Sequence, residues 1–133
     1  MYENITPEYN AALDVIIRAR RSVRAFSPIP PERKAIEAII RAGLFAPFPA
    51  LAVAAQSLSF CLQNMWLKAT SLGIGFQLVS AAMQMDSDPD FCKLLSIPCG
   101  EYALDGCALG YPADTCQPPS VEYPTADKSV SWL

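Results

Sequence analysis

The chain has 133 residues, which corresponds to a single domain of ordinary size spanning residues 1–133. Apolar residues make up 52% and charged residues only 17%, so the composition excludes intrinsic disorder and suggests that another subunit covers part of the surface. The net charge of −3 argues against nucleic-acid binding, and no apolar run reaches the roughly 20 residues of a membrane span.

Three helices are predicted in the first half of the chain. Thr6 to Glu8 has the cap, proline and acidic residue of a helix start, and an apolar stripe follows at helical spacing. A second helix begins at Pro31 and stops before Pro47. A third helix runs from about Ala50 to Leu72 and is apolar nearly all round, which predicts burial on several sides. Gly73 is suited to end it.

The second half alternates short strands with one short helix. Phe76 to Val79 and Glu101 to Leu109 are predicted as strands, and a helix from Asp88 to Leu95 separates them. Residues 113–133 are predicted to form an extended C-terminal arm, polar and proline-containing but ending in apolar residues. Helices come first and no βαβ alternation is visible, so we expect an α+β fold.

A basic cluster is the clearest candidate binding site. Arg20, Arg21, Ser22 and Arg24 follow the first helix and precede a turn. Guanidinium groups match phosphate oxygens in a bidentate way, and the serine adds a hydroxyl donor. The alternative is a solvated helix end whose arginines complement the helix dipole. Both interpretations are open from these residues alone.

The five cysteines are expected to be free thiols. Their odd number, with no secretory signal visible at the start of the chain, favours a reducing cytoplasm over a disulfide framework. No two of the four later cysteines have the two-residue spacing that zinc and iron–sulfur sites favour, so no metal site is predicted. A cysteine-ligated metal protein is a third functional alternative. The cysteines are Cys61, Cys92, Cys99, Cys107 and Cys116.

Other catalytic patterns are weak. The chain has no histidine, which excludes Ser-His nucleophilic catalysis, and we predict no catalytic side chain. Asp86, Asp88 and Asp90 alternate as calcium-loop ligands do, but the glycine and glutamate of such a loop are missing, so helix capping explains them better. Gly73-Ile74-Gly75 follows a helix and not a strand, which argues against a dinucleotide fingerprint.

Several fragments, in this order along the chain, resemble the nitroreductase family of FMN-dependent oxidoreductases. They cover roughly Ile16 to Pro112. The fragments are RRSVRAF from Arg20 to Phe26, Ala46-Pro47, QNMWLKATSLGIGF from Gln63 to Phe76, LLSIP from Leu94 to Pro98, and ALGYP from Ala108 to Pro112.

The resemblance implies a fold, a cofactor and a site. The fold would be a long central helix with a small, mostly antiparallel sheet in an intertwined homodimer, whose C-terminal arm wraps the neighbouring subunit. The activity would be reduction of small nitro or quinone-type acceptors with NAD(P)H as co-substrate. Arg20, Arg21, Ser22 and Arg24 would hold the FMN phosphate, and the backbone of Val79, Ser80 and Ala81 would approach the isoalloxazine ring.

The chain also departs from the family pattern. Phe48-Pro49 leads almost directly into the long helix, where the family has a polar segment that contacts the flavin. Residues Gln117 to Ala126 contain no basic residue, although the family usually places one there. Two hypotheses follow: an FMN-dependent oxidoreductase, or a flavin-free family member acting as a dimeric binding or structural module. Flavin absorbance of the purified protein distinguishes them.

Overall fold

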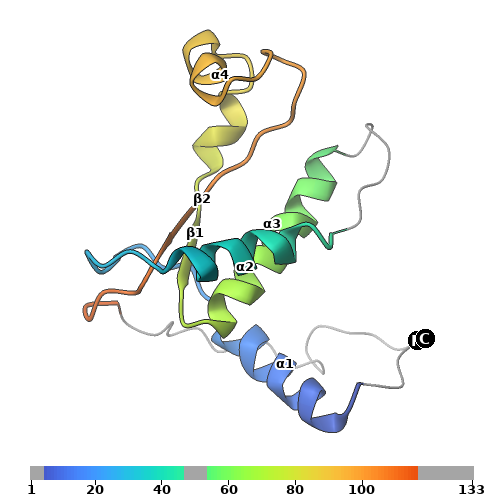
Figure 1. Ribbon diagram of the computed structural model, residues 1–133, viewed down its shortest axis with the longest axis vertical. Helices are drawn as coiled ribbons and strands as arrows, with labels where there is room; N and C mark the ends of the chain where they lie inside the picture. Colours follow the sequence, from blue (N-terminus) through green and yellow to red (C-terminus); the bar gives the residue numbers. More distant parts are fainter. Residues whose placement is uncertain (1–4, 47–53, 117–133) are drawn as a thin grey trace, which may run out of the picture.

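The computed structural model describes residues 5–46 and 54–116, and these form four α-helices, one 3₁₀ helix and two strands. Figure 1 shows α1 and α4 at opposite ends, with the other helices and the strand pair between them. In chain order the elements are α1 (Pro7–Ala19), α2 (Arg33–Gly43), α3 (Ala54–Ser71), β1 (Gly75–Leu78), the 3₁₀ helix η2 (Ser80–Gln84), α4 (Pro89–Leu95) and β2 (Cys107–Gly110).

Helix ends follow the local signals closely. Pro7 occupies the first turn of α1, and Gly73 has a φ of 69° after the last residue of α3, a conformation that glycine adopts without strain. Asp88 caps α4, because its Oδ1 accepts a hydrogen bond of 2.8 Å from the backbone N–H of Phe91. The aspartate pattern is therefore a helix cap, as expected. The predicted start of the third helix at Ala50 lies outside the described residues.

Helix α2 packs mainly against α3, and a glycine lets the two approach closely. A Cβ atom at Gly43 would lie 2.8 Å from Cys61 Sγ and 2.8 Å from Met65 Cγ, both on α3. The buried core lies where this helix pair meets β1. Its members are Ile39, Trp66, Ala69, Ile74 and Phe76, with Ala35, Leu62, Met65, Cys107, Leu109 and Tyr111 packed against them.

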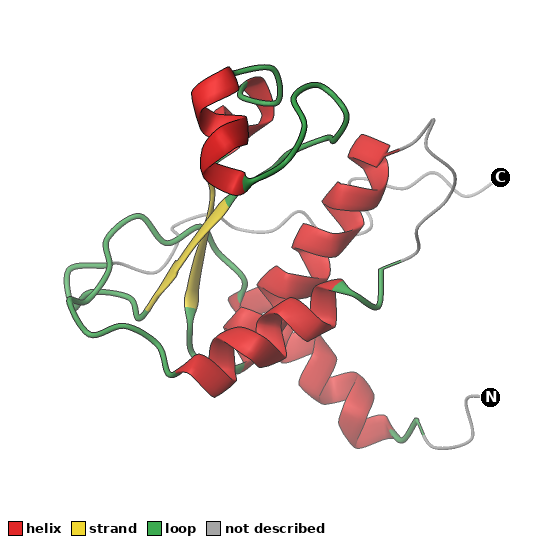
Figure 2. Cartoon of the chain, turned by 45° about the horizontal axis from the view of Figure 1, so that its top comes forward, coloured by secondary structure: helices red, strands yellow, loops and turns green. Residues whose placement is uncertain are grey.

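The sheet is a short antiparallel pair. Gly75 pairs with Gly110 at one end and Leu78 pairs with Cys107 at the other. Figure 2 shows the two strands running side by side away from the helices towards η2 and α4. The second strand is shorter than predicted, because residues 101–106 lie in bends and loop and pairing begins at Cys107, opposite the last residue of β1.

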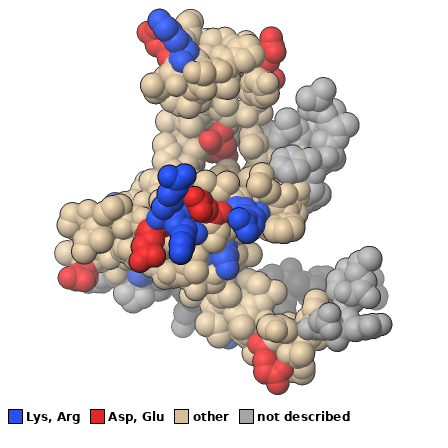
Figure 3. Space-filling view, viewed as in Figure 1, with Lys and Arg blue, Asp and Glu red and all other residues tan. Residues whose placement is uncertain are grey.

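Helix α1 has no buried residue, although its sequence carries the predicted apolar stripe. Its contacts with the rest of the described chain are made mainly with α3, and large side chains such as Val15, 66% exposed, face outward. On the face seen in Figure 3, charged side chains gather over α2, whereas much of α1 is uncharged. The stripe predicted a helix correctly, but the residues that the structure describes do not bury it.

No helix in the described ranges combines the length and the hydropathy that crossing a membrane requires.

Candidate functional site

The arginine cluster lies against the sheet and is not a free helix end. Helix α1 ends at Ala19, and Arg20 has extended backbone angles, with φ −61° and ψ 123°. Ser22 then forms a parallel bridge with Phe76 of β1, and the backbone N–H of Val23 donates to the Phe76 carbonyl at 3.1 Å. We call residues 20–24 the arginine segment. Backbone pairing with β1 fixes its path.

The residues that follow the arginine segment form further backbone hydrogen bonds, with the residues after β2. The backbone N–H of Ser27 donates to the Tyr111 carbonyl at 2.7 Å, and that of Ala113 donates to the Ala25 carbonyl at 2.9 Å. Gly110 is needed at this point, because a Cβ there would lie 2.7 Å from the Phe26 ring. The segment after α1 is therefore tied both to β1 and to the residues that follow β2.

The side chains of the arginine segment divide between two sides. In an extended chain successive side chains point in opposite directions. Val23 is only 2% exposed, and it lines a cavity together with Arg21, whereas Ser22 and Arg24 are exposed. Arg21 therefore points inward, while Ser22 and Arg24 present a hydroxyl and a guanidinium group to the outside.

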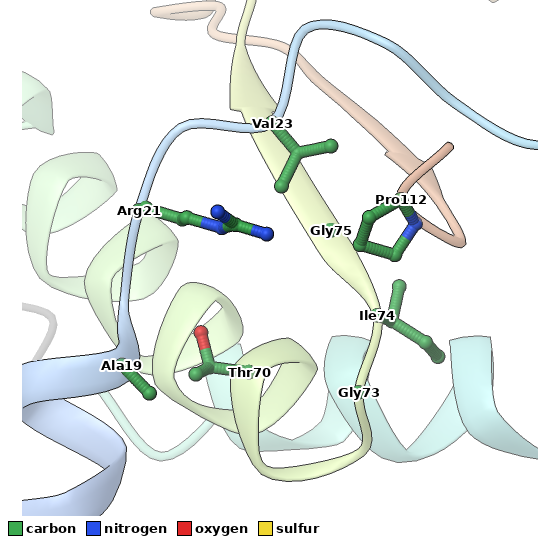
Figure 4. A pocket seen from close by; sticks show the side chains of 8 residues that line it. All are labelled: Ala19, Arg21, Val23, Thr70, Gly73, Ile74, Gly75 and Pro112. Carbon is green, nitrogen blue, oxygen red and sulfur yellow. The ribbon is translucent and has the colours of Figure 1, made fainter. Parts of the chain in front are cut away.

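The cavity beside Arg21 is small. Its volume is about 170 Å³, and Figure 4 shows the Arg21 side chain pointing into it between Val23 and Thr70. The remaining lining residues are Ala19, Gly73, Ile74, Gly75 and Pro112. Sites for drug-sized ligands usually have about 300–1,000 Å³. This cavity is therefore too small for a flavin, and a flavin held at Ser22 and Arg24 would lie on the open side of the segment.

An aromatic pair supports the arginine segment from below. Trp66 of α3 and Phe76 of β1 are stacked, with ring centroids 5.1 Å apart. The guanidinium carbon of Arg20 lies 4.5 Å from the Trp66 ring centroid, and the indole N–H of Trp66 donates to the Arg21 carbonyl at 3.2 Å. These contacts fix both an arginine side chain and the backbone that follows it.

The second part of the predicted site lies beyond the other end of β1. Val79, Ser80 and Ala81 are exposed, and η2 begins at Ser80 where a strand end was predicted. The Val79 N–H already donates to the Gly106 carbonyl at 2.8 Å. Ser80 and Ala81 are the first two residues of the 3₁₀ turn, where backbone N–H groups have no carbonyl partner inside the helix. These two residues are thus the candidates in this trio for donating to a ligand.

The cysteines form no metal centre among the described residues, and all five are free thiols. Cys92 and Cys99 donate to the carbonyls of Asp86 and Asp88, respectively. The hydrogen bond with Cys99 raises the pKa of the Cys92 thiol to about 11, with smaller contributions from burial and the nearby aspartates. Burial likewise raises the pKa of the Cys107 thiol. Because thiolates are the reactive form, these thiols are poor nucleophiles at neutral pH.

Trp66 is not among the residues predicted for the site. In the sequence Trp66 is one of many apolar residues of the third helix, and the helical pattern predicts its burial but not the segment that covers it. Arg20 and Trp66 are 46 positions apart, and only the crossing of the arginine segment over α3 brings them together.

Part of the chain matches a known protein family, and its fold matches solved structures. Residues 49–111 match the model of the nitroreductase family. The fold matches a nitroreductase with bound FMN from Bacteroides fragilis, with a TM-score of 0.77 at 19% identity, covering 91% of this chain and 98% of that one.

Two further solved structures agree. One is a putative nitroreductase in complex with FMN from Desulfovibrio desulfuricans, with a TM-score of 0.73 at 16% identity, covering 98% of this chain and 99% of that one. The other is a putative NADH dehydrogenase/NAD(P)H nitroreductase from Bacteroides thetaiotaomicron, with a TM-score of 0.72 at 21% identity, covering 91% of this chain and 96% of that one. Comparison with curated protein sequences gave no match. Residues 49–111 therefore match the nitroreductase family, and the chain has the fold of these solved nitroreductase structures.

Proposed function

We propose that this chain is an FMN-dependent oxidoreductase that reduces small nitro or quinone-type acceptors with NAD(P)H. The observation that carries the proposal is the position of β1, which joins the two halves of the candidate site. The arginine segment pairs with Phe76, and Val79 follows only three residues later, about 10 Å along an extended chain. Two of the similar structures contain FMN, which supports the cofactor, and a third is described as an NAD(P)H nitroreductase, which supports the co-substrate.

The residues of the arginine segment suit a phosphate group. Arg24 is exposed and offers a planar fork of N–H donors, and the exposed Ser22 hydroxyl lies two residues before it on the same side. Arg20 is half-buried, and its guanidinium group lies over the Trp66 ring. Arg21 would contribute positive charge from the inner side of the segment. Ser80 and Ala81 would donate backbone N–H groups to the ring.

The chemistry would then be divided between cofactor and protein. A bound flavin supplies the hydride transfer between nicotinamide and acceptor, and the protein supplies binding, orientation and electrostatics. This division fits a chain without histidine, in which no side-chain acid–base pair is needed. In that role, residues 20–24 anchor one end of the cofactor, while the start of η2 orients the other.

We further propose that the active form is a homodimer in the cytoplasm. Helix α1 leaves large apolar side chains uncovered, among them Tyr9, Leu13 and Ile17. Apolar surface of this extent is typical of an interface with another chain. A second copy would also enclose the open side of the arginine segment, where Ser22 and Arg24 are exposed. Five free thiols suit a reducing compartment.

The absorbance spectrum of the purified protein, together with an FMN titration, tests the proposal. Replacing both Arg20 and Arg24 by alanine should weaken FMN binding by about 3–6 kcal/mol, because two charge-assisted contacts of about 1.5–3 kcal/mol each are lost. Arg18→Ala is the matched control, since Arg18 belongs to the last turn of α1 and precedes the extended segment. A colourless protein that does not bind added FMN would instead favour the flavin-free module.

A further inference from the structure

We propose that Trp66 is a positioning residue for the phosphate end of the cofactor: it holds the Arg20 guanidinium group and the Arg21 backbone in the geometry that binds phosphate. This inference rests on the proposed FMN function. It concerns a side chain on α3, which the pattern of the arginine segment does not include.

The first support is that Trp66 makes two different contacts with adjacent residues. Its ring lies under the Arg20 guanidinium carbon at 4.5 Å, and its indole N–H donates to the Arg21 carbonyl at 3.2 Å. A ring contact alone would leave the backbone free to shift, and a backbone bond alone would leave the arginine side chain free to rotate. Together they fix the direction of the side chain and the path of the chain that leads to Ser22.

The second support is that Trp66 is itself held rigidly. It is 8% exposed, its ring stacks on Phe76, and Phe76 is fully buried. Phe76 also accepts the backbone hydrogen bond from Val23 at 3.1 Å. The arginine segment is thus fixed from α3 through Trp66 and from β1 through Phe76, and the two supporting rings contact each other. A side chain positioned by such a packed second layer holds its ligand-binding geometry more firmly than one on a free loop.

The third support is that an aromatic ring and a phosphate contact different parts of a guanidinium group. A guanidinium group that lies over an aromatic ring uses its face, while its N–H donors point outward in its own plane. Phosphate oxygens bind those in-plane donors. Trp66 therefore does not compete with phosphate for Arg20. It removes in advance part of the rotational freedom that a long side chain would otherwise lose on binding.

The test compares two ligands that differ only in the phosphate. Dissociation constants for FMN and for riboflavin are measured by quenching of flavin fluorescence in the wild type, Trp66→Leu, Trp66→Phe and Leu62→Ala. Trp66→Leu removes the ring and the N–H donor, and Trp66→Phe keeps a ring but removes the donor. Leu62→Ala is the control, because Leu62 packs against the same core from α3, one turn earlier, and takes no part in the ring contact with Arg20 or the hydrogen bond to Arg21.

We expect the preference for FMN over riboflavin to fall about tenfold in Trp66→Leu, since a contact of about 1.4 kcal/mol corresponds to a factor of ten. Trp66→Phe should lose a smaller part of the preference for FMN. This variant also tests the inference if Trp66→Leu does not fold. Leu62→Ala should lower the melting temperature without changing the preference. An unchanged preference in folded Trp66 variants, or an equal loss in Leu62→Ala, would overturn the inference while leaving the proposed function intact. A wild type without FMN binding would overturn both.

Discussion

The contact between Gly75 and Val23 gives the sharpest test of how the arginine segment is held. A Cβ atom at Gly75 would lie 2.7 Å from Val23 Cβ and 2.8 Å from each of its two Cγ atoms, whereas ordinary contacts begin at 3.4 Å. Gly75→Ala must therefore push the arginine segment and β1 apart by about 0.7 Å to reach ordinary contact. Val23 is buried and its backbone N–H donates to the Phe76 carbonyl, so moving the segment weakens both its packing and this hydrogen bond.

The expected cost of Gly75→Ala is about 2 kcal/mol, within the range for overpacking a buried site. Urea unfolding measures it directly, and the melting temperature should fall by about 6–10 °C for a chain of this size. Gly106→Ala is the matched control. Its added Cβ would lie 3.1 Å from the Ala82 Cβ and at ordinary contact distances of 3.5 and 3.7 Å from Val79, so we expect a much smaller change.

A double-mutant cycle with Val23→Ala identifies the contact responsible. Val23→Ala removes both Cγ atoms but leaves the Cβ at 2.7 Å, so it relieves part of the clash. The double mutant should be more stable than the sum of the two single changes predicts, by about 1 kcal/mol. Strictly additive changes would show that the alanine is accommodated elsewhere, and would refute the close packing of the segment on β1.

Three further predictions concern α4, the pH dependence and the assembly. Asp88→Ala should lower the free energy of unfolding, measured in urea, by about 0.5–2 kcal/mol because α4 loses its cap. Asp88→Asn should keep most of this stabilisation, because the asparagine side chain can also accept the hydrogen bond. The pKa of the Cys92 thiol is about 11 in the folded chain against a usual 9.0, so the folded state is stabilised below pH 9 and loses this stabilisation between about pH 9 and 11. In Cys92→Ala, the melting temperature should fall less over this pH range than it does in the wild type. Removing residues 120–133 should weaken the proposed dimer in sedimentation, and a full-length monomer at micromolar concentration would contradict that assembly.

Local signals in the sequence determined the ends of the helices. A proline at the start of α1, an aspartate cap on α4 and a glycine after α3 each act through the backbone of their own turn, so no distant residue is needed to interpret them. The fragments from Arg20 to Pro112 likewise pointed to the nitroreductase family, whose model matches residues 49–111. Residues 113–133 were predicted as an arm, and only Ala113 to Cys116 fall within the described chain.

The tertiary structure alone decided which residues surround the cluster. The sequence left open whether the arginines form a solvated helix end, because their composition is the same in both cases. Pairing of Ser22 and Val23 with Phe76 placed the segment at the sheet, and that choice depends on where β1 runs. Tertiary structure also decided the length of β2, which is set by its partner strand, and the contact of Trp66 with the arginine segment. Contacts between residues 46 positions apart leave no periodic trace in a sequence, since they arise only when helix and strand have packed.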